Sequence, residues 1–421
     1  MSRLIASLAL AVGLFTTVSA SAVEISISCS ALGKEYEICK QGVDAWASRT
    51  GNTVKIVSTP NSATERLALY QQLLAAGAGD IDVFQIDVVW TGILADHLQD
   101  LTAKAQGEIG GHLPAMAETS QVNGKLMAMP WFADAGLLYY RQDLLDKYRR
   151  PVPQTWADLT ETARIIQEGE RKDGKGDFWG YVWQGRAYEG LTTVALEWIA
   201  SYNGGTIIDE KGEIIVDNPK AAVALRTAAG WVGTITPEGV LNYTEEEARG
   251  VFQAGNAAFM RNWPYAWALA QGADSSIKDK VRIAPLPKGG ADGRHAGTLG
   301  GQLLAVSKYS KNADAAIDLV MYLTGQEEQK RRAIQGSFNP TIVSLYGDPD
   351  IAKANPFIGE LADVFSNAVA RPAAITGQNY NKVSTEFFNA VHQVLSKRAE
   401  PEQALSRLDR DLKRIKRNSW Q

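Results

Sequence analysis

Two carboxylates and one tryptophan lie where the sequence indicates binding chemistry. Asp87 ends the apolar segment 82–87, which is typical of a buried strand. An acidic residue there points into the crevice at the carboxyl ends of an open α/β sheet, where ligands bind. Asp134 follows a proline-stiffened, extended segment, and Trp263 is extended because Pro264 follows it. Carboxylates bind hydroxyl groups in charge-assisted hydrogen bonds, and aromatic planes stack on apolar C–H faces.

Each of these three residues also has an ordinary structural interpretation. Asp87 could cap the helix that follows it or lie solvated at the strand end. Asp134 could brace a connection between two parts of the chain. Trp263 could pack in a core, which is the usual fate of a tryptophan.

The composition excludes several classes of protein. The 421 residues carry 43 Lys+Arg and 47 Asp+Glu, a formal charge of −4, which argues against a nucleic-acid-binding surface. Two cysteines and four scattered histidines cannot supply a clustered metal module, so we expect no metal and no cofactor. The length suffices for two domains, and 11 Trp and 14 Tyr are an unusual aromatic content.

The first 22 residues are typical of a secretory signal peptide. Arg3 precedes the apolar run 4–15, and small residues with an A-x-A site end at Ala22. The run is much shorter than the about 20 residues that span a bilayer. We therefore expect an exported, periplasmic protein. We expect no lipid anchor, because Cys29 lies too far behind the apolar run.

Cys29 and Cys39 are the two cysteines, ten positions apart. In an oxidising compartment they are most simply a disulfide. Two buried thiols are the alternative. Cys29 would end a first strand at 24–28, and Cys39 would lie in the first turns of the following helix.

The remaining segments alternate between strand and helix patterns. Strands are predicted at 54–58, 136–141 and 180–183, and a helix at 65–76. Another helix begins behind Thr155 as its N-cap. This alternation predicts an α/β fold with mostly parallel sheets. The extended, proline-containing segments 128–131 and 283–287 are candidate crossings between two lobes, and clefts between lobes are preferred ligand sites.

Several stretches resemble a known family. They are Asp82 to Asp87, Pro130 to Arg141, Phe178 to Leu191, Gly255 to Trp267 and Ala284 to Gly301. In order and over nearly the whole chain, they resemble the periplasmic sugar-binding proteins of ABC transporters, above all the trehalose/maltose-binding proteins. The resemblance implies a two-lobed, type II periplasmic-binding-protein fold with the ligand in the interlobe cleft. One lobe would comprise 23–132 plus 286–325, and the other 134–285 plus 326–421, with a third crossing near Gly325.

The same resemblance implies which residues bind the ligand. They are Glu35, Arg66, Asp87, Phe132, Asp134, Trp263, Gly300, Gly301, Gln302 and Arg371.

Some of these assignments have open alternatives. Glu35 and Glu37 both lie in an expected loop at 33–39, and either could instead be a first-turn glutamate favoured by the helix dipole. Arg66 could form a surface ion pair with its neighbour Glu65. The pair at 300–301 could be a plain turn. Trp267, Tyr265, Trp183 and Trp90 are expected in the core or the cleft wall.

Two positions depart from the family pattern. Gln302 stands where the family usually has an aromatic residue, and Phe132 stands where the nearest relatives have a tyrosine. The first change removes a stacking plane and adds an amide. The second removes a hydroxyl group. Both changes could alter which disaccharide fits.

The sequence thus predicts a monomeric carrier of a disaccharide such as trehalose, maltose, sucrose or a related α-glucoside. It would deliver the sugar to ABC transporter permease subunits in the inner membrane. One alternative is a binder of another carbohydrate or a polyol. The other is a secreted glycoside hydrolase in which Asp87 and Asp134 flank the glycosidic bond.

Overall fold

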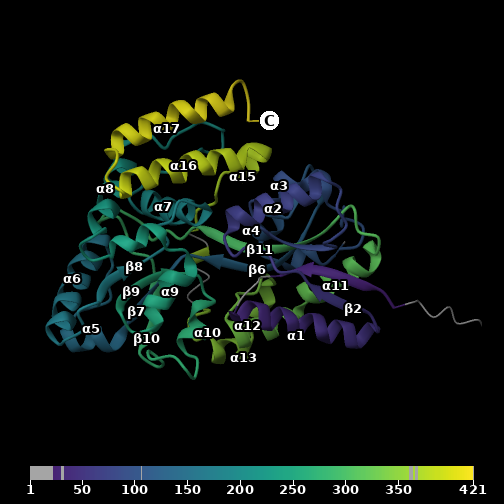
Figure 1. The fold of residues 1–421 in the computed structure, drawn as a ribbon, viewed down its shortest axis with the longest axis horizontal. Helices are drawn as coiled ribbons and strands as arrows, with labels where there is room; N and C mark the ends of the chain where they lie inside the picture. The colour runs from purple at the N-terminus through teal and green to yellow at the C-terminus, as the bar shows by residue number, and fades with distance from the viewer. Residues whose placement is uncertain (1–21, 30–32, 106, 360–363, 366–367, 421) are drawn as a thin grey trace, which may run out of the picture.

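Two β-sheets surrounded by helices form the centre of the protein (Figure 1). The computed structural model describes residues 22–29, 33–105, 107–359, 364–365 and 368–420, so all but the last residue of the expected signal peptide lies outside it. Within these ranges no helix is long and apolar enough to cross a membrane.

The first sheet has five strands in the order β2-β1-β3-β11-β6. β1 pairs in parallel with β2 and β3, whereas β11 pairs antiparallel with β3 and β6. Every residue of β3 is buried, including the polar Gln85 and Asp87, as expected for a central strand that is covered on both faces. The bounds are β1 (Glu24–Ser28), β2 (Thr53–Ile56), β3 (Val83–Asp87), β6 (Met129–Ala135) and β11 (Leu299–Val306).

The second sheet has four strands in the order β10-β7-β9-β8. Only β8 and β9 are parallel there, and the other neighbours are antiparallel. A short hairpin of β4 (Gln121–Val122) and β5 (Lys125–Leu126) lies apart. The bounds in the sheet are β7 (Leu137–Arg141), β8 (Trp179–Val182), β9 (Ala257–Asn262) and β10 (Val281–Pro285).

The expectation of mostly parallel sheets is wrong, because both sheets are mixed. The chain leaves the first sheet along β6 and enters the second along β7, with only Gly136 between them, and it returns from β10 to β11. Strands that run out and back in this way pair antiparallel with their neighbours. The two passages between the sheets are Gly136 and the segment 286–298. They lie side by side, since a Cβ on Gly297 would be 3.0 Å from the carbonyl oxygen of Gly136.

Helices on the side of the five-stranded sheet begin where local signals place them. α2 is capped by Ser62, whose side chain accepts from the Glu65 N–H. α11 and α12 are separated only by Gly325, at the expected third crossing. The segment 33–39 is not a loop but the start of α1, because the helix already begins at Gly33. The bounds are α1 (Gly33–Thr50), α2 (Ala63–Ala75), α3 (Thr91–Leu94), α4 (Pro114–Thr119), α11 (Ala313–Thr324) and α12 (Gln326–Gly336).

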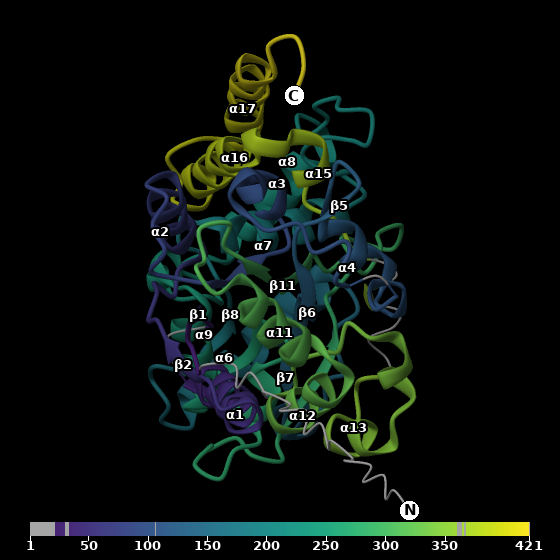
Figure 2. The same cartoon turned by 90° about the vertical axis from the view of Figure 1, so that its right-hand side faces the viewer.

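On the other side, α6 begins behind Thr155 as predicted, and Asp158 completes a capping box. α16 packs against α7, α8 and α17, and α16 and α17 lie across one end of the protein (Figures 1 and 2). The bounds are α5 (Gln142–Tyr148), α6 (Trp156–Lys172), α7 (Glu189–Ser201), α8 (Pro219–Trp231), α9 (Glu245–Gln253), α10 (Ala266–Ala270), α13 (Pro349–Ala354), α15 (Ala373–Thr376), α16 (Tyr380–Leu395) and α17 (Pro401–Lys416). Short 3-10 helices are η1 (Ala95–His97), η2 (Ile109–Gly111), η3 (Glu238–Asn242), η4 (Val343–Gly347) and η5 (Gly377–Asn379).

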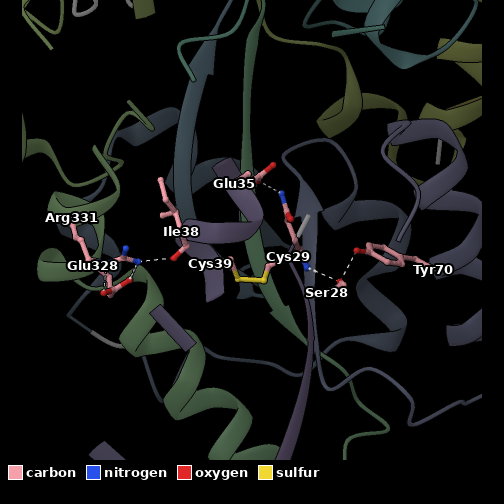
Figure 3. Close-up of a disulfide and its surroundings, with 9 residues drawn as sticks. Ser28, Cys29, Glu35, Ile38, Cys39, Tyr70, Glu328 and Arg331 are labelled. Atoms are coloured by element: carbon pink, nitrogen blue, oxygen red, sulfur yellow. Dashed lines mark hydrogen bonds and ion pairs between the residues drawn. A yellow bond between two sulfur atoms is a disulfide. The ribbon is translucent and has the colours of Figure 1, made fainter. Parts of the chain in front are cut away.

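The predicted disulfide between Cys29 and Cys39 is present, and both residues are buried (Figure 3). It joins the residue after β1 to the second turn of α1, with the two Cα atoms 6.3 Å apart. Glu35 lies one helical turn before Cys39, so the bond holds the beginning of α1 against the sheet at the place where Glu35 projects.

Candidate ligand-binding cleft

A cavity of about 190 Å³ lies between the elements of the two sheets, and all ten residues implied by the sequence resemblance line it. They come from positions as far apart as Glu35 and Arg371 in the chain. The residues that line the cavity but were not predicted as ligand-binding are Lys34, Asn61, Ala63, Gln85, Glu189, Gly190, Thr193, Glu245, Glu246, Arg249, Tyr265, Leu269 and Phe338.

Arg371 joins two carboxylates at the wall of the cavity. Its Nη2 donates to Asp87 Oδ1 at 2.7 Å and its Nη1 to Glu189 Oε1 at 2.8 Å. The Arg371 side chain is only 1% exposed. Burial raises the pKa of Glu189, and the Arg371 charge opposes this shift. A buried guanidinium that faces two carboxylates is well compensated, so this group of charges fixes the wall on which Asp87 projects.

Asp87 combines a structural contact with free hydrogen-bonding capacity. Its Oδ1 also accepts the backbone N–H of Val89 at 3.1 Å, so the carboxylate braces the turn after β3. It is not a helix cap, because Trp90 holds the N-cap position of α3. Within the described ranges Oδ2 accepts no hydrogen bond. That oxygen is therefore available to a ligand in the cavity.

The Asp134 carboxyl group has no hydrogen bond to any residue that the structure describes, so it does not brace the crossing. Burial, followed by the nearby negative charge of Glu35, raises the pKa of Asp134 to about 8. At neutral pH the group is thus mostly protonated and can both donate to and accept from a hydroxyl group. It lies across from Gly300 in the pairing of β6 with β11.

Glu35, not Glu37, faces the cavity. Gln85 Nε2 donates to Glu35 Oε1 at 2.9 Å and to Gln302 Oε1 at 3.3 Å, which links three side chains of the cavity wall. Glu37 pairs instead with Lys34, and its side chain is 62% exposed. Glu35 lies in the first turn of α1, so the helix-dipole interpretation also holds for it. The amide of Gln302 therefore extends a polar chain where the family has an aromatic ring.

Arg66 does not form the surface ion pair with Glu65 that was the alternative. It is buried, and its guanidinium lies 5.5 Å from the Trp90 ring centroid. Its Nε is buried without a hydrogen-bond partner among the described residues. Glu65 pairs with Arg186 at 2.8 Å instead. Arg66 consequently brings an incompletely satisfied donor group to the cavity.

Trp263 lines the cavity and is not a core residue. Its Nε1 donates to Glu245 Oε1 at 3.3 Å, and the Arg261 guanidinium lies 3.9 Å from its ring centroid. A Cβ on Gly300 would lie 3.1 Å from the indole, so only a glycine leaves the ring its full space.

Gly300 and Gly301 lie within β11 and not in a plain turn. Gly301 has φ +125, and a Cβ there would collide with the carbonyl oxygen of Phe132. These glycines bring the strand backbone to the cavity surface. Phe132 itself packs against Trp131 and Phe338, with ring centroids 5.5 and 4.9 Å apart.

The four other aromatic residues divide between the core and the cleft wall, as expected. Trp90 and Trp183 are fully buried, and Trp267 packs on Phe357. Tyr265 lines the cavity and donates to Glu246 Oε1 at 2.6 Å.

Sequence reasoning missed Gln85, Glu189 and the Glu245–Glu246 pair. Gln85 could have been found, because it is two positions before Asp87 in the same strand and side chains two apart share a face. Glu189 begins α7 as an acidic first-turn residue, a pattern that also occurs at many solvent-exposed helix ends. Nothing local distinguishes it.

A two-lobed α/β chain, a cleft lined by carboxyl groups and guanidinium groups, and an aromatic plane in that cleft together define the class of solute-binding proteins. The chain belongs to the bacterial extracellular solute-binding protein family, whose model matches residues 31–330. Because this is a family of transporter binding proteins, the chain is not an enzyme, and the glycoside hydrolase alternative is excluded.

Individual relatives agree with this class. A probable ABC transporter-binding protein of Deinococcus radiodurans is 53% identical over 422 residues, and the alignment covers 100% of both chains. The structure of maltose-bound T. maritima MalE3 is similar with a TM-score of 0.89 and 41% identity, over 94% of this chain and all of that one. A mannitol-binding protein of Pseudomonas aeruginosa is 25% identical over 58% of this chain and 56% of its own length. The protein is a sugar-binding component of an ABC transporter.

Proposed function

We propose that the cleft captures an α-linked disaccharide, such as trehalose, maltose, sucrose or a related α-glucoside. The protein then delivers it, as a monomer in the periplasm without a lipid anchor, to permease subunits in the inner membrane. The observation that carries this proposal is the cavity itself, where Trp263 offers a plane for a pyranose ring and carboxyl groups surround it. Similarity to a maltose-bound protein supports the same class of ligand.

Nine of the ten predicted residues have one of three roles in this proposal, and Gln302 is a separate case. Asp87 Oδ2, Asp134 and the Glu35 carboxylate accept from or donate to hydroxyl groups. Arg66 and Arg371 supply guanidinium donors. The aromatic and glycine positions shape the space, with Trp263 and Phe132 against the apolar faces of the sugar and Gly300 and Gly301 opening the backbone to it. At Gln302 an amide stands where the family usually has an aromatic ring, so the cleft loses a stacking surface there.

Binding would also move the two lobes. We place the first lobe at 23–132 plus 286–325 and the second at 134–285 plus 326–421. Asp87 is the last residue of β3 in the first sheet, whereas Trp263 follows β9 of the second sheet and Glu245 begins α9. A ligand held by both groups binds the closed form better than the open form and shifts the population towards it.

A second candidate ligand is a linear polyol. The similarity to a mannitol-binding protein and the loss of an aromatic plane at Gln302 favour it, because a polyol offers hydroxyl groups but no ring face to stack. The two candidates differ in their dependence on Trp263. A disaccharide needs the indole plane, whereas a polyol depends mainly on the polar groups.

Isothermal titration calorimetry with purified protein tests the proposal. The panel contains trehalose, maltose, sucrose, mannitol and ribitol. We expect binding of at least one α-linked disaccharide and more than tenfold weaker binding by Asp87→Ala and by Trp263→Ala. Binding of mannitol or ribitol alone would establish the polyol alternative. Unchanged affinity in both variants would show that the ligand lies elsewhere.

A further inference from the structure

A buried ion pair lies directly behind the Trp263 ring. Arg261 in β9 and Glu197 in α7 are each 1% exposed. Arg261 Nε donates to Glu197 Oε2 at 2.9 Å, its Nη2 donates to Glu197 Oε1, and its Nη1 donates to Gln184 Oε1 at 3.2 Å. Neither partner lines the cavity. A fork that donates in parallel to one carboxylate has a fixed orientation.

The guanidinium of this pair stacks on the ring that the proposed ligand would use. Its central carbon lies 3.9 Å from the Trp263 ring centroid, which is within the range of a cation–π contact. The ring is also held at its edge by the hydrogen bond from Nε1 to Glu245. The Arg261 contact sets the plane of the indole, and the Glu245 contact sets its rotation within that plane.

The same ion pair touches both chain passages between the sheets. Glu197 Oε1 accepts the backbone N–H of Thr298 at 3.2 Å, just before β11 begins. Gly136, between β6 and β7, lies against both charged groups, and a Cβ there would collide with the Glu197 carboxylate. Glu197 therefore contacts both passages directly. Through its ion pair with Arg261 it also supports the ring of Trp263.

We propose that Glu197 and Arg261 are positioning residues. They keep the orientation of the Trp263 ring fixed relative to the two chain passages while the lobes close. The proposal rests on the proposed function, since it assumes that a sugar ring stacks on Trp263. Without the pair, the indole would lose the support behind it and the passage at Thr298 would lose a hydrogen bond. Ligand affinity should then fall although no residue in contact with the ligand has changed.

Glu197→Gln tests this inference, with Glu170→Gln as the matched control. Glu170 is also 1% exposed and is paired with Lys147 and Lys175 at 2.6 and 2.5 Å, but it does not line the cavity. Both variants lose a buried charge partner and should lower the melting temperature. Only Glu197→Gln should weaken the best disaccharide of the panel, by tenfold or more in calorimetry.

A double-mutant cycle shows whether the effect passes through the indole. In the Trp263→Ala background, Glu197→Gln should weaken binding by no more than twofold, because the plane it positions is gone. Equal losses in both backgrounds, or unchanged affinity of the single variant, would overturn the proposal. If Glu197→Gln does not fold, Arg261→Lys takes its place in the cycle. Lysine keeps the charge but lacks the fork, so the same tenfold loss is expected.

Hydrogen exchange of the ligand-free protein separates this inference from the proposed function. Glu197→Ala removes the acceptor of the Thr298 N–H and should speed the exchange of that amide at least tenfold, whereas Glu170→Ala should not. Unchanged exchange at Thr298 would refute the link to the passage even if sugars bind. A wild-type protein that binds none of the sugars would refute the proposed function without changing the exchange result.

Discussion

We expect the protein to lose stability as the pH rises, because the folded state holds a proton on Asp134. Asp134→Asn should remove this contribution to the pH dependence. Burial, helped by Glu35, raises the pKa of this carboxyl group from 3.8 to about 8 in the folded protein. Between those values the folded state holds a proton that the unfolded state has lost. The stability contribution is therefore complete below pH 3.8 and is lost as the pH rises towards 8.

The size of the effect follows from the two pKa values. Between pH 5 and pH 7, the free energy of unfolding should fall by about 2.7 kcal/mol through Asp134 alone. Asparagine does not titrate, so the difference between variant and wild type isolates this contribution. Buried His112, whose pKa burial lowers to about 4, acts in the opposite direction but equally in both proteins.

Urea unfolding followed by tryptophan fluorescence at pH 5, 6 and 7 measures these free energies. The exposed Asp217→Asn should run parallel to the wild type. If the Asp134→Asn curve also runs parallel, the carboxyl group is ionised in the folded protein and the reasoning fails. Since asparagine keeps a donor and an acceptor, Asp134→Asn should bind sugar at pH 7 within about threefold of the wild type, whereas Asp134→Ala should not.

Three further expectations concern single features of the structure. Replacing Cys29 and Cys39 together by serine opens a loop with a sequence separation of 10 and should cost about 2.7 kcal/mol of unfolding free energy in denaturant titrations. Gly301→Ala places a side chain at φ +125 against a neighbouring carbonyl group and should cost at least about 2 kcal/mol, seen as a lower melting temperature. Arg186→Ala breaks a pair in which Arg186 is 45% and Glu65 53% exposed, so stability should change by less than about 1 kcal/mol, and a larger change would contradict the weak-pair interpretation.

Local signals predicted many of the elements because their causes are local. The cap at Thr155 depends on Asp158, three residues away, and the mainly apolar segment 82–87 predicts β3 without distant partners. Family resemblance then supplied what local patterns cannot. The ten residues that share one cavity are spread along the chain, and no spacing rule places Glu35 near Asp134.

Long-range pairing explains most of what was missed. The strand directions depend on β11 entering between β3 and β6, far from both in sequence. The contact between Arg371 and Asp87 joins residues 284 positions apart, so its partners look unrelated in the sequence. Arg261 was hidden for another reason. It is two residues from Trp263 in an extended strand, and that spacing alone does not show that its guanidinium covers the ring.

The position of β11 in the sheet also constrains how the chain can be made. β3 and β6 are synthesised early, but the strand that joins them lies at 299–306. Until it emerges, each has an open edge, and the whole four-stranded sheet is synthesised in the meantime. Unpaired strand edges attract other chains. A nascent chain of this protein should therefore need a chaperone or rapid passage into the compartment where it folds, and truncations ending before 299 should aggregate.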